Sequence, residues 1–118
     1  MPLWDGAPYE YSRSAGGLVF AAGACPLDEH GTVVGGGLEA QAKCAAANLL
    51  AALAEAGVGV DSLVKTTIYV VGEERRDLVR VWDVVSAVLG RAPSTLLGVS
   101  FLGYPGQLVE IEAVAAAG

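Results

Sequence analysis

The chain has 118 residues and a mass of 12.0 kDa, a length that predicts a single domain over residues 1–118. Hydrophobic residues make up 53% of it, but Asn48 and Glu55 interrupt the longest apolar run, which excludes a membrane span. The formal charge of −6 argues against nucleic acid as a partner, because such affinity depends on cationic contacts to phosphate. Two cysteines are too few for a disulfide scaffold, so we expect a reduced, cytoplasmic protein.

The N-terminal part of the chain predicts a hairpin and one further short strand. Residues 18–22 form an apolar run after Gly16 and Gly17, which predicts a strand with residues 9–12 as its partner. After a turn at residues 28–31, residues 32–34 are predicted to form a short strand.

A helix is predicted next, over residues 38–56, with Gly57 as its C-terminal glycine. One face of this helix is apolar and is expected to be buried: Leu38, Ala42, Ala45, Leu49 and Leu53. The polar residues are expected to lie away from that stripe: Gln41, Lys43, Asn48 and Glu55.

The C-terminal half predicts a strand, a second helix and two more strands. The β-branched run at residues 63–71 is the strongest strand signal, and residues 74–89 have apolar residues at helical spacing, including Trp82. Residues 95–102 and 108–115 are predicted as the last strands. The fold class is therefore α+β, with two helices packed on one face of a mixed sheet. Subunit association would cover the other face.

Individual motifs give few signs of chemistry. The glycines at residues 35–37 lack the spacing of a phosphate-binding loop, and His30, the only histidine, lies in a predicted turn and is expected to be solvated. We expect no metal ion and no cofactor, since His, Cys and carboxylates never cluster. Cys25 is interpreted as a small structural residue rather than a nucleophile, and Cys44 is given no role.

The last predicted strand contains two glutamates. Glu110 and Glu112 must point to the same side, opposite Val109 and Ile111, because side chains alternate along a strand. This pattern fits either a carboxylate pair on an inner face or a solvent-facing edge strand.

Four segments together resemble the RidA/YjgF family of reactive-intermediate (imine) deaminases, also described as L-PSP endoribonuclease-like. They are residues 8–9, 17–27, 64–70 and 108–113, and the resemblance extends from Pro8 to Ala115. It implies a fold similar to the small trimeric chorismate mutases, and a homotrimer that binds small molecules in clefts between subunits.

The resemblance also implies site residues. Glu110 matches the glutamate that positions water, Tyr9 a wall of the cleft, and Gly23 and Thr95 the backbone around the ligand. In the family an Arg before Ser-Thr binds the substrate carboxylate, but here Pro93 precedes Ser94, and Arg91 lies two residues upstream.

A second departure concerns Trp82, which stands where many members have a pocket Asn; as part of the apolar helical stripe it is also expected to lie in the core. The sequence therefore predicts an imine or enamine deaminase that does not act on standard 2-imino acids. A non-catalytic binding protein on the same scaffold is the alternative, and the acidic charge disfavours endoribonuclease activity.

Overall fold

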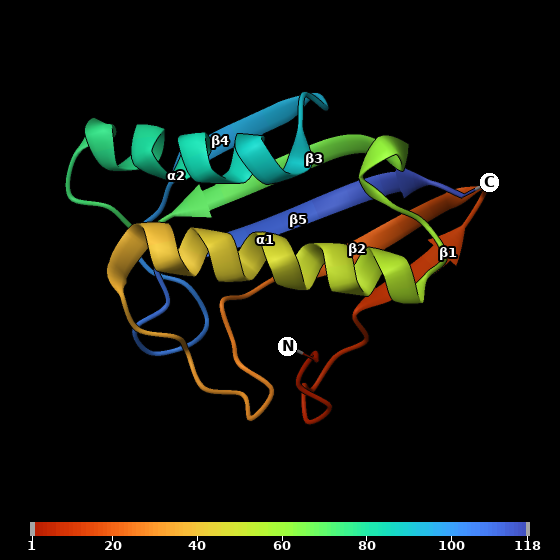
Figure 1. Ribbon diagram of the computed structural model, residues 1–118, viewed down its shortest axis with the longest axis horizontal. Coiled ribbons are helices and arrows are strands. Elements are labelled where there is room, and N and C mark those ends of the chain that lie inside the picture. Colours follow the sequence, from red (N-terminus) through yellow and green to blue (C-terminus); the bar gives the residue numbers. More distant parts are fainter. Residues whose placement is uncertain (1, 118) are drawn as a thin grey trace.

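Two helices lie side by side across one face of a mixed sheet in the computed structural model, which describes residues 2–117 (Figure 1). The helices of this part of the chain are α1 (Gly37–Glu55) and α2 (Arg75–Leu89), with a single 3₁₀ turn at Val60–Ser62. The strands are β1 (Ser12–Ala15), β2 (Leu18–Ala24), β3 (Leu63–Val70), β4 (Ser94–Gly98) and β5 (Val109–Ala116). The predicted fold class is confirmed.

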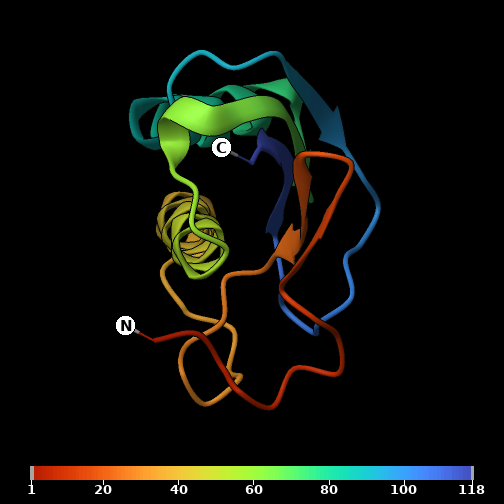
Figure 2. The ribbon, with the colours of Figure 1, turned by 90° about the vertical axis from the view of Figure 1, so that its right-hand side faces the viewer.

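The sheet has the order β1-β2-β5-β3-β4, so the last strand of the chain lies at its centre. β5 is antiparallel to both of its neighbours, and the β3–β4 pair is parallel. The parallel pair needs a crossover connection, and α2 provides it. Seen edge-on, the helices form one layer and the strands the other (Figure 2).

The β1–β2 hairpin differs from the prediction. Its first strand begins at Ser12 rather than occupying residues 9–12, and Ala15 pairs with Leu18 across a two-residue turn. Gly16 and Gly17 both have positive φ, the geometry of the tight turn that matches strand twist. This turn places the first strand three residues later in the chain than predicted and leaves Tyr9 outside the sheet.

Two other strand predictions were too long. Residues 32–34 contribute only an isolated bridge between Val33 and Leu27. β4 ends at Gly98 instead of residue 102, because β3, its neighbour, ends at Val70. A final backbone bond from Val99 N–H to the Val70 carbonyl closes the ladder.

The helices agree closely with the prediction. α1 ends at Glu55, and Gly57 follows with positive φ, as expected of a C-terminal glycine. α2 begins after Glu74, and the Asp77 carboxylate accepts backbone N–H bonds from Glu73 and Glu74. Within the described residues, neither α1 nor α2 is long and apolar enough to cross a bilayer.

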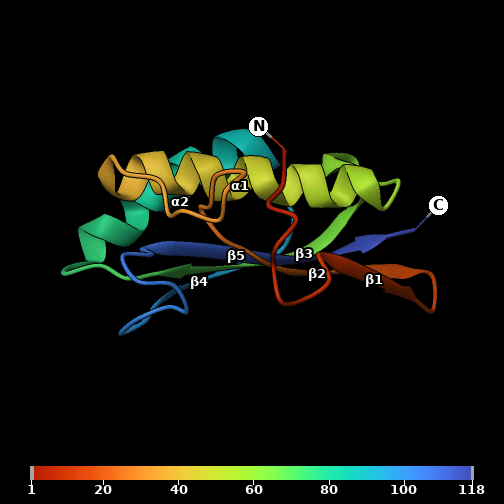
Figure 3. The same ribbon diagram turned by 90° about the horizontal axis from the view of Figure 1, so that it is seen from below.

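The hydrophobic core lies between the helices and the sheet. The predicted apolar stripe of α1 is buried there, against Ile68 of β3 and Val109 and Ile111 of β5. No helix of residues 2–117 lies on the opposite face of the sheet, which we call the open face (Figure 3). Phe20 and Leu97 remain exposed on that side of the molecule at 46% and 41%.

Candidate functional site

The two glutamates of β5 lie on the open face. Val109 and Ile111 are completely buried under the helices, whereas Glu110 and Glu112 alternate with them and keep partial exposure. The edge-strand interpretation of Glu110 is wrong, since β5 is hydrogen-bonded on both sides. Glu112 accepts a hydrogen bond from the Tyr69 hydroxyl, which raises the pKa of that phenol to about 12.

Glu110 lines an open hollow of about 280 Å³ that is built from distant parts of the chain. The N-terminal segment, the end of β2 and the loop before β5 contribute its lining residues: Tyr9, Ala22, Gly23, Cys25, Gly103, Tyr104 and Glu110. The hydroxyls of Tyr9 and Tyr104 lie 3.3 Å apart. The structure thus brings together Tyr9, Gly23 and Glu110, three of the residues that the sequence singled out.

The Glu110 carboxylate is fixed by specific neighbours. Its Oε1 accepts hydrogen bonds from Gln107 Nε2 at 3.2 Å and from the Cys25 thiol at 3.4 Å. Its Oε2 lies over Gly23, where an added Cβ would sit 2.3 Å from that oxygen. The carboxylate can therefore keep this place only if position 23 has no side chain, because a Cβ there would displace it.

Cys25 lies beside this carboxylate as a neutral thiol. Burial, the charge of Glu110 and the hydrogen bond to Glu110 together raise the pKa of Cys25 to about 12, with burial as the largest cause. Nucleophilic cysteines have a lowered pKa, so the raised pKa of Cys25 agrees with its interpretation as a structural residue. Burial and the bond to Tyr104 likewise raise the pKa of Tyr9, which leaves its phenol neutral and able to donate.

Two buried amides of α1 hold the loops around the hollow, and the sequence reasoning missed both. Asn48 donates to the carbonyls of Cys25 and Leu27, both at 2.9 Å, while Gln41 donates to the Gly106 carbonyl at 2.9 Å and accepts from Leu108 N–H at 2.7 Å. Both were expected away from the buried stripe, yet they are only 7% and 4% exposed. Buried amides need partners, and the loop backbones supply them.

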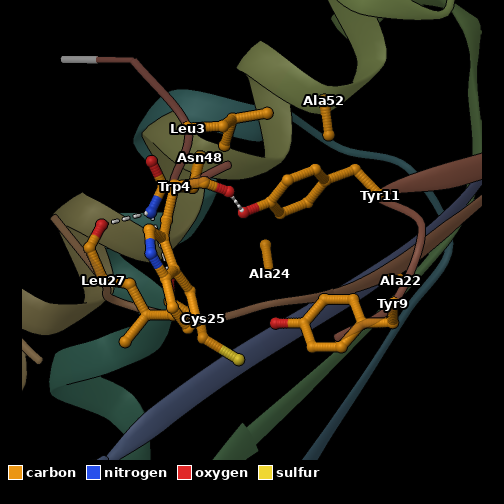
Figure 4. A pocket seen from close by; sticks show the side chains of 10 residues that line it. All are labelled: Leu3, Trp4, Tyr9, Tyr11, Ala22, Ala24, Cys25, Leu27, Asn48 and Ala52. Carbon is orange, nitrogen blue, oxygen red and sulfur yellow. Dashed lines mark hydrogen bonds between the residues drawn. The ribbon is translucent and has the colours of Figure 1, made fainter. Parts of the chain in front are cut away.

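A small pocket shares Tyr9, Ala22 and Cys25 with the hollow (Figure 4). The Tyr9 hydroxyl and the Cys25 sulfur point toward one another on one side of it, and Asn48 lies near Trp4 on another side. Tyr11 closes another side by donating to the Trp4 carbonyl. Its volume of about 10 Å³ holds no more than roughly one water molecule. This pocket is therefore too small for a substrate, whereas the hollow around Glu110 has a volume of about 280 Å³.

The residues at the start of β4 lie apart from Glu110 within one chain. Glu110 pairs with Tyr69, which pairs with Leu97, four residues beyond Pro93. At about 3.3 Å per residue, Pro93 is displaced from Glu110 by roughly 13 Å along the strands, in addition to two strand spacings of about 4.8 Å across them. Arg91 is exposed in the preceding turn.

Ser94 and Thr95 point to different faces of the sheet. The Ser94 hydroxyl bonds with that of buried Thr66, which places it on the helix side. Thr95 accepts a hydrogen bond from Lys65. It pairs with Thr67, which in turn pairs with Glu112, so Thr95 lies on the open face together with Glu112.

The remaining candidates lie elsewhere. Trp82 of α2 packs against the core on the helix side, in agreement with its place in the apolar stripe, and does not line the hollow. The His30 side chain is 79% exposed in a turn that Asp28 stabilises through two backbone N–H bonds. Among residues 2–117, no three His, Cys, Asp or Glu side chains are placed to hold a metal ion.

Comparisons with known proteins all identify the same family. A family model described as Endoribonuclease L-PSP matches residues 5–117. The RutC family protein of Pyrococcus abyssi is 32% identical over 110 residues, which cover 92% of this chain and 85% of that protein.

Solved structures agree with this match over nearly the whole chain. A Mycobacterium tuberculosis member of the YjgF/YER057c/UK114 family is 28% identical, with coverage of 99% and 98% and a TM-score of 0.81. The Rid family protein YyfA of Yersinia pestis, of unknown function, is 29% identical, with coverage of 93% and 88% and a TM-score of 0.84.

Proposed function

Because the chain belongs to the RidA/YjgF family, we propose that it is an enzyme that deaminates a small imine or enamine in the hollow around Glu110. The observation that supports this proposal is the carboxylate itself. Its Oε1 is held by Gln107 and Cys25, and no hydrogen bond from the described residues reaches Oε2. A carboxylate that lines a cavity, with one oxygen fixed and the other without a hydrogen-bond partner, is suited to orient and deprotonate water.

The reaction is hydrolysis of a carbon–nitrogen double bond. Glu110 accepts a proton from water as the water oxygen bonds to the imine carbon, and that proton passes to the nitrogen to give a carbinolamine. Glu110 then takes the proton of the hydroxyl and passes it to the nitrogen, so that the carbon–nitrogen bond breaks, ammonia leaves, the carbonyl forms and Glu110 is again a carboxylate. With an enamine, Glu110 first carries a proton from nitrogen to the far carbon of the carbon–carbon double bond, which yields the imine.

The two tyrosines of the hollow supply neutral donors to this chemistry. Tyr9 and Tyr104 are linked through their hydroxyls, and the raised pKa of Tyr9 keeps its proton in place. A phenol at this position donates to the nitrogen or to the forming oxygen without adding a second negative charge beside Glu110.

A second copy of the chain completes the site in this proposal. The hollow is open, and the same face of the sheet carries the exposed side chains of Phe20 and Leu97. In a homotrimer, Pro93 and Thr95 of a neighbouring copy would close the cleft over Glu110. Light scattering at micromolar concentration is expected to give three times the 12.0 kDa of one chain, and a monomeric mass would contradict the shared cleft.

The substrate is proposed to lack the carboxylate of the 2-imino acids. A bidentate guanidinium–carboxylate pair is one of the stronger polar contacts available to a site, and Pro93 cannot form it. Glu110 is the one charged residue among those lining the hollow. A neutral or cationic imine therefore fits the site better than an anionic one.

The alternative functions make different predictions. A non-catalytic binding protein would bind such a molecule without turning it over, and the missing Arg at Pro93 favours this alternative. Endoribonuclease activity, which the family description suggests, requires contact with a polyanion, but the chain carries −6 and the hollow a carboxylate.

The experiment compares two imines that differ only in a carboxylate. Propan-1-imine is generated from propylamine by an amine oxidase, and 2-iminobutanoate from 2-aminobutanoate by an amino acid oxidase. Trapping of each imine by semicarbazide is measured with and without the protein. The wild type is expected to suppress trapping of propan-1-imine and to leave 2-iminobutanoate almost unaffected.

The variant Pro93→Arg restores the arginine that binds the substrate carboxylate in the family. It is expected to gain activity on 2-iminobutanoate, because it places a guanidinium before Ser94. If the wild type hydrolyses 2-iminobutanoate well, Arg91 or another cation already serves as the anchor and the substrate proposal is wrong. If neither imine is consumed, the binding-protein alternative replaces the enzyme.

A further inference from the structure

Glu110 is held by a side chain whose every hydrogen-bonding group is occupied. Gln107 is 97% buried, being only 3% exposed, and it follows directly after the turn that carries Tyr104 and Gly106. Its Oε1 accepts from the backbone N–H of Tyr104 at 3.1 Å, and its Nε2 donates to the Val109 carbonyl at 3.0 Å and to Glu110 Oε1 at 3.2 Å.

This arrangement fixes the orientation of the amide. Both partners of Nε2 are acceptors and the partner of Oε1 is a donor, so a flipped amide would place an oxygen against two other oxygens. The N–H that faces Glu110 therefore cannot rotate away without the loss of the other bonds. An amide held in this way presents a fixed donor to the carboxylate.

We propose that Gln107 is a positioning residue that sets the orientation of Glu110, so that Oε1 is engaged and Oε2 is presented to water in the hollow. This inference rests on the proposed deaminase function. Gln107 also joins the two sides of the site, because the same amide holds the backbone of Tyr104, whose hydroxyl lies beside that of Tyr9.

The chain offers a matched control in Gln41. It is also a buried glutamine, 4% exposed, and it also anchors the loop before β5, through Gly106 and Leu108. None of its hydrogen bonds reaches Glu110. Replacing either glutamine with Met removes amide bonds from the same loop at similar shape, but only Gln107→Met removes a donor from the carboxylate.

The experiment measures kcat and KM for propan-1-imine in the wild type, Gln107→Met and Gln41→Met, with each melting temperature recorded. Gln107→Met is expected to lower kcat about tenfold with KM little changed, since a misplaced base slows proton transfer without weakening binding. Gln41→Met is expected to lower the melting temperature and to change kcat less than about twofold. Equal losses of kcat in the two variants would show that loop stability alone matters, and would overturn the inference.

A crystal structure of Gln107→Met separates this inference from the proposed function. The Glu110 carboxylate is expected to rotate away from its place over Gly23, and an unmoved carboxylate would overturn the positioning role. If the wild type hydrolyses no imine, the deaminase proposal fails, and the position of Glu110 in this variant still decides whether Gln107 holds it. Gln107→Asn, which keeps an amide but is one methylene too short for Glu110, replaces Gln107→Met if the latter does not fold.

Discussion

The two faces of β5 differ in burial and in the kind of contacts that their side chains make. On the helix side, Val109 and Ile111 are completely buried in the core between the helices and the sheet. On the open face, Glu110 and Glu112 are partly exposed, and each is held by a hydrogen bond from another part of the chain. The alternation of side chains along the strand assigns each pair to a face of the sheet. It predicts that the apolar pair is buried, but it does not predict what surrounds the two glutamates.

The glutamates of the open face also differ from one another. Glu112 is paired with Tyr69, its neighbour on the adjacent strand, in the middle of the sheet. Glu110 lies where β2 bulges and the loop before β5 folds back, so that Gly23 and Gln107 surround it. Both glutamates line hollows of the open face, of about 280 Å³ at Glu110 and about 200 Å³ at Glu112. They differ in their partners, because Glu112 is bonded to a tyrosine of the adjacent strand and Glu110 is held by Gln107 and Cys25.

The largest expected effect distinguishes these two glutamates. Glu110→Gln is expected to lower the rate of propan-1-imine hydrolysis by roughly 10²–10⁴-fold, the usual contribution of a general base. Glu112→Gln, the matched control, is expected to retain most of the activity. Circular dichroism should show both variants folded. Equal activity in the two variants would remove Glu110 from the reaction.

The next effect concerns the helix side. Ile111→Ala is expected to lower the free energy of unfolding by about 2–5 kcal/mol, because it removes buried methyl groups and leaves a cavity. Glu112→Ala, one residue away on the open face, is expected to cost less than about 1 kcal/mol. Urea denaturation at a fixed protein concentration measures both. A similar loss in the two variants would mean that assembly buries the open face as deeply as the core.

The core and the order of elements could be predicted from the sequence because they depend on local patterns. The stripe of Leu38, Leu49 and Leu53 follows the helical period, and the run in β3 has the β-branched residues of a buried strand. Element ends were less accurate. Gly16 and Gly17 set the hairpin register through their positive φ, a property that the alternation of side chains does not reveal.

The candidate site could be predicted only where a resemblance supplied it. Tyr9, Gly23 and Glu110 were identified by their similarity to family motifs, and the structure brings them together. Gln107, Gln41 and Asn48 were missed, because their roles depend on backbone groups in loops far along the chain. A buried amide in a polar position has no periodic signal, so only the folded structure shows its partners.

A smaller expected effect tests the contact between Gly23 and Glu110. In Gly23→Ala the new methyl group would overlap the Oε2 atom, and the flexible carboxylate is the part that moves. Activity on propan-1-imine is expected to fall by up to about 100-fold, the cost of displacing a catalytic group by about 1 Å. Gly35→Ala, where a methyl group meets no other atom within 4 Å, is the control. Equal activities would mean that Glu110 functions from another position.

The smallest expected effect uses Cys25 as a reporter of the charge on Glu110. In a Cys44→Ser background, alkylation of Cys25 by iodoacetamide at pH 8.5 should be slow, because its pKa of about 12 leaves little thiolate. Burial is the largest cause of that shift and the negative charge of Glu110 the second. Glu110→Gln removes the second cause and leaves the first, so the pKa falls, the thiolate fraction rises, and alkylation should become about tenfold faster. Glu112→Gln, whose side chain bonds to Tyr69 instead, should not change the rate. If Glu110→Gln reacted no faster than the wild type, burial alone would account for the inert thiol, and the carboxylate in the hollow would not carry its charge beside Cys25.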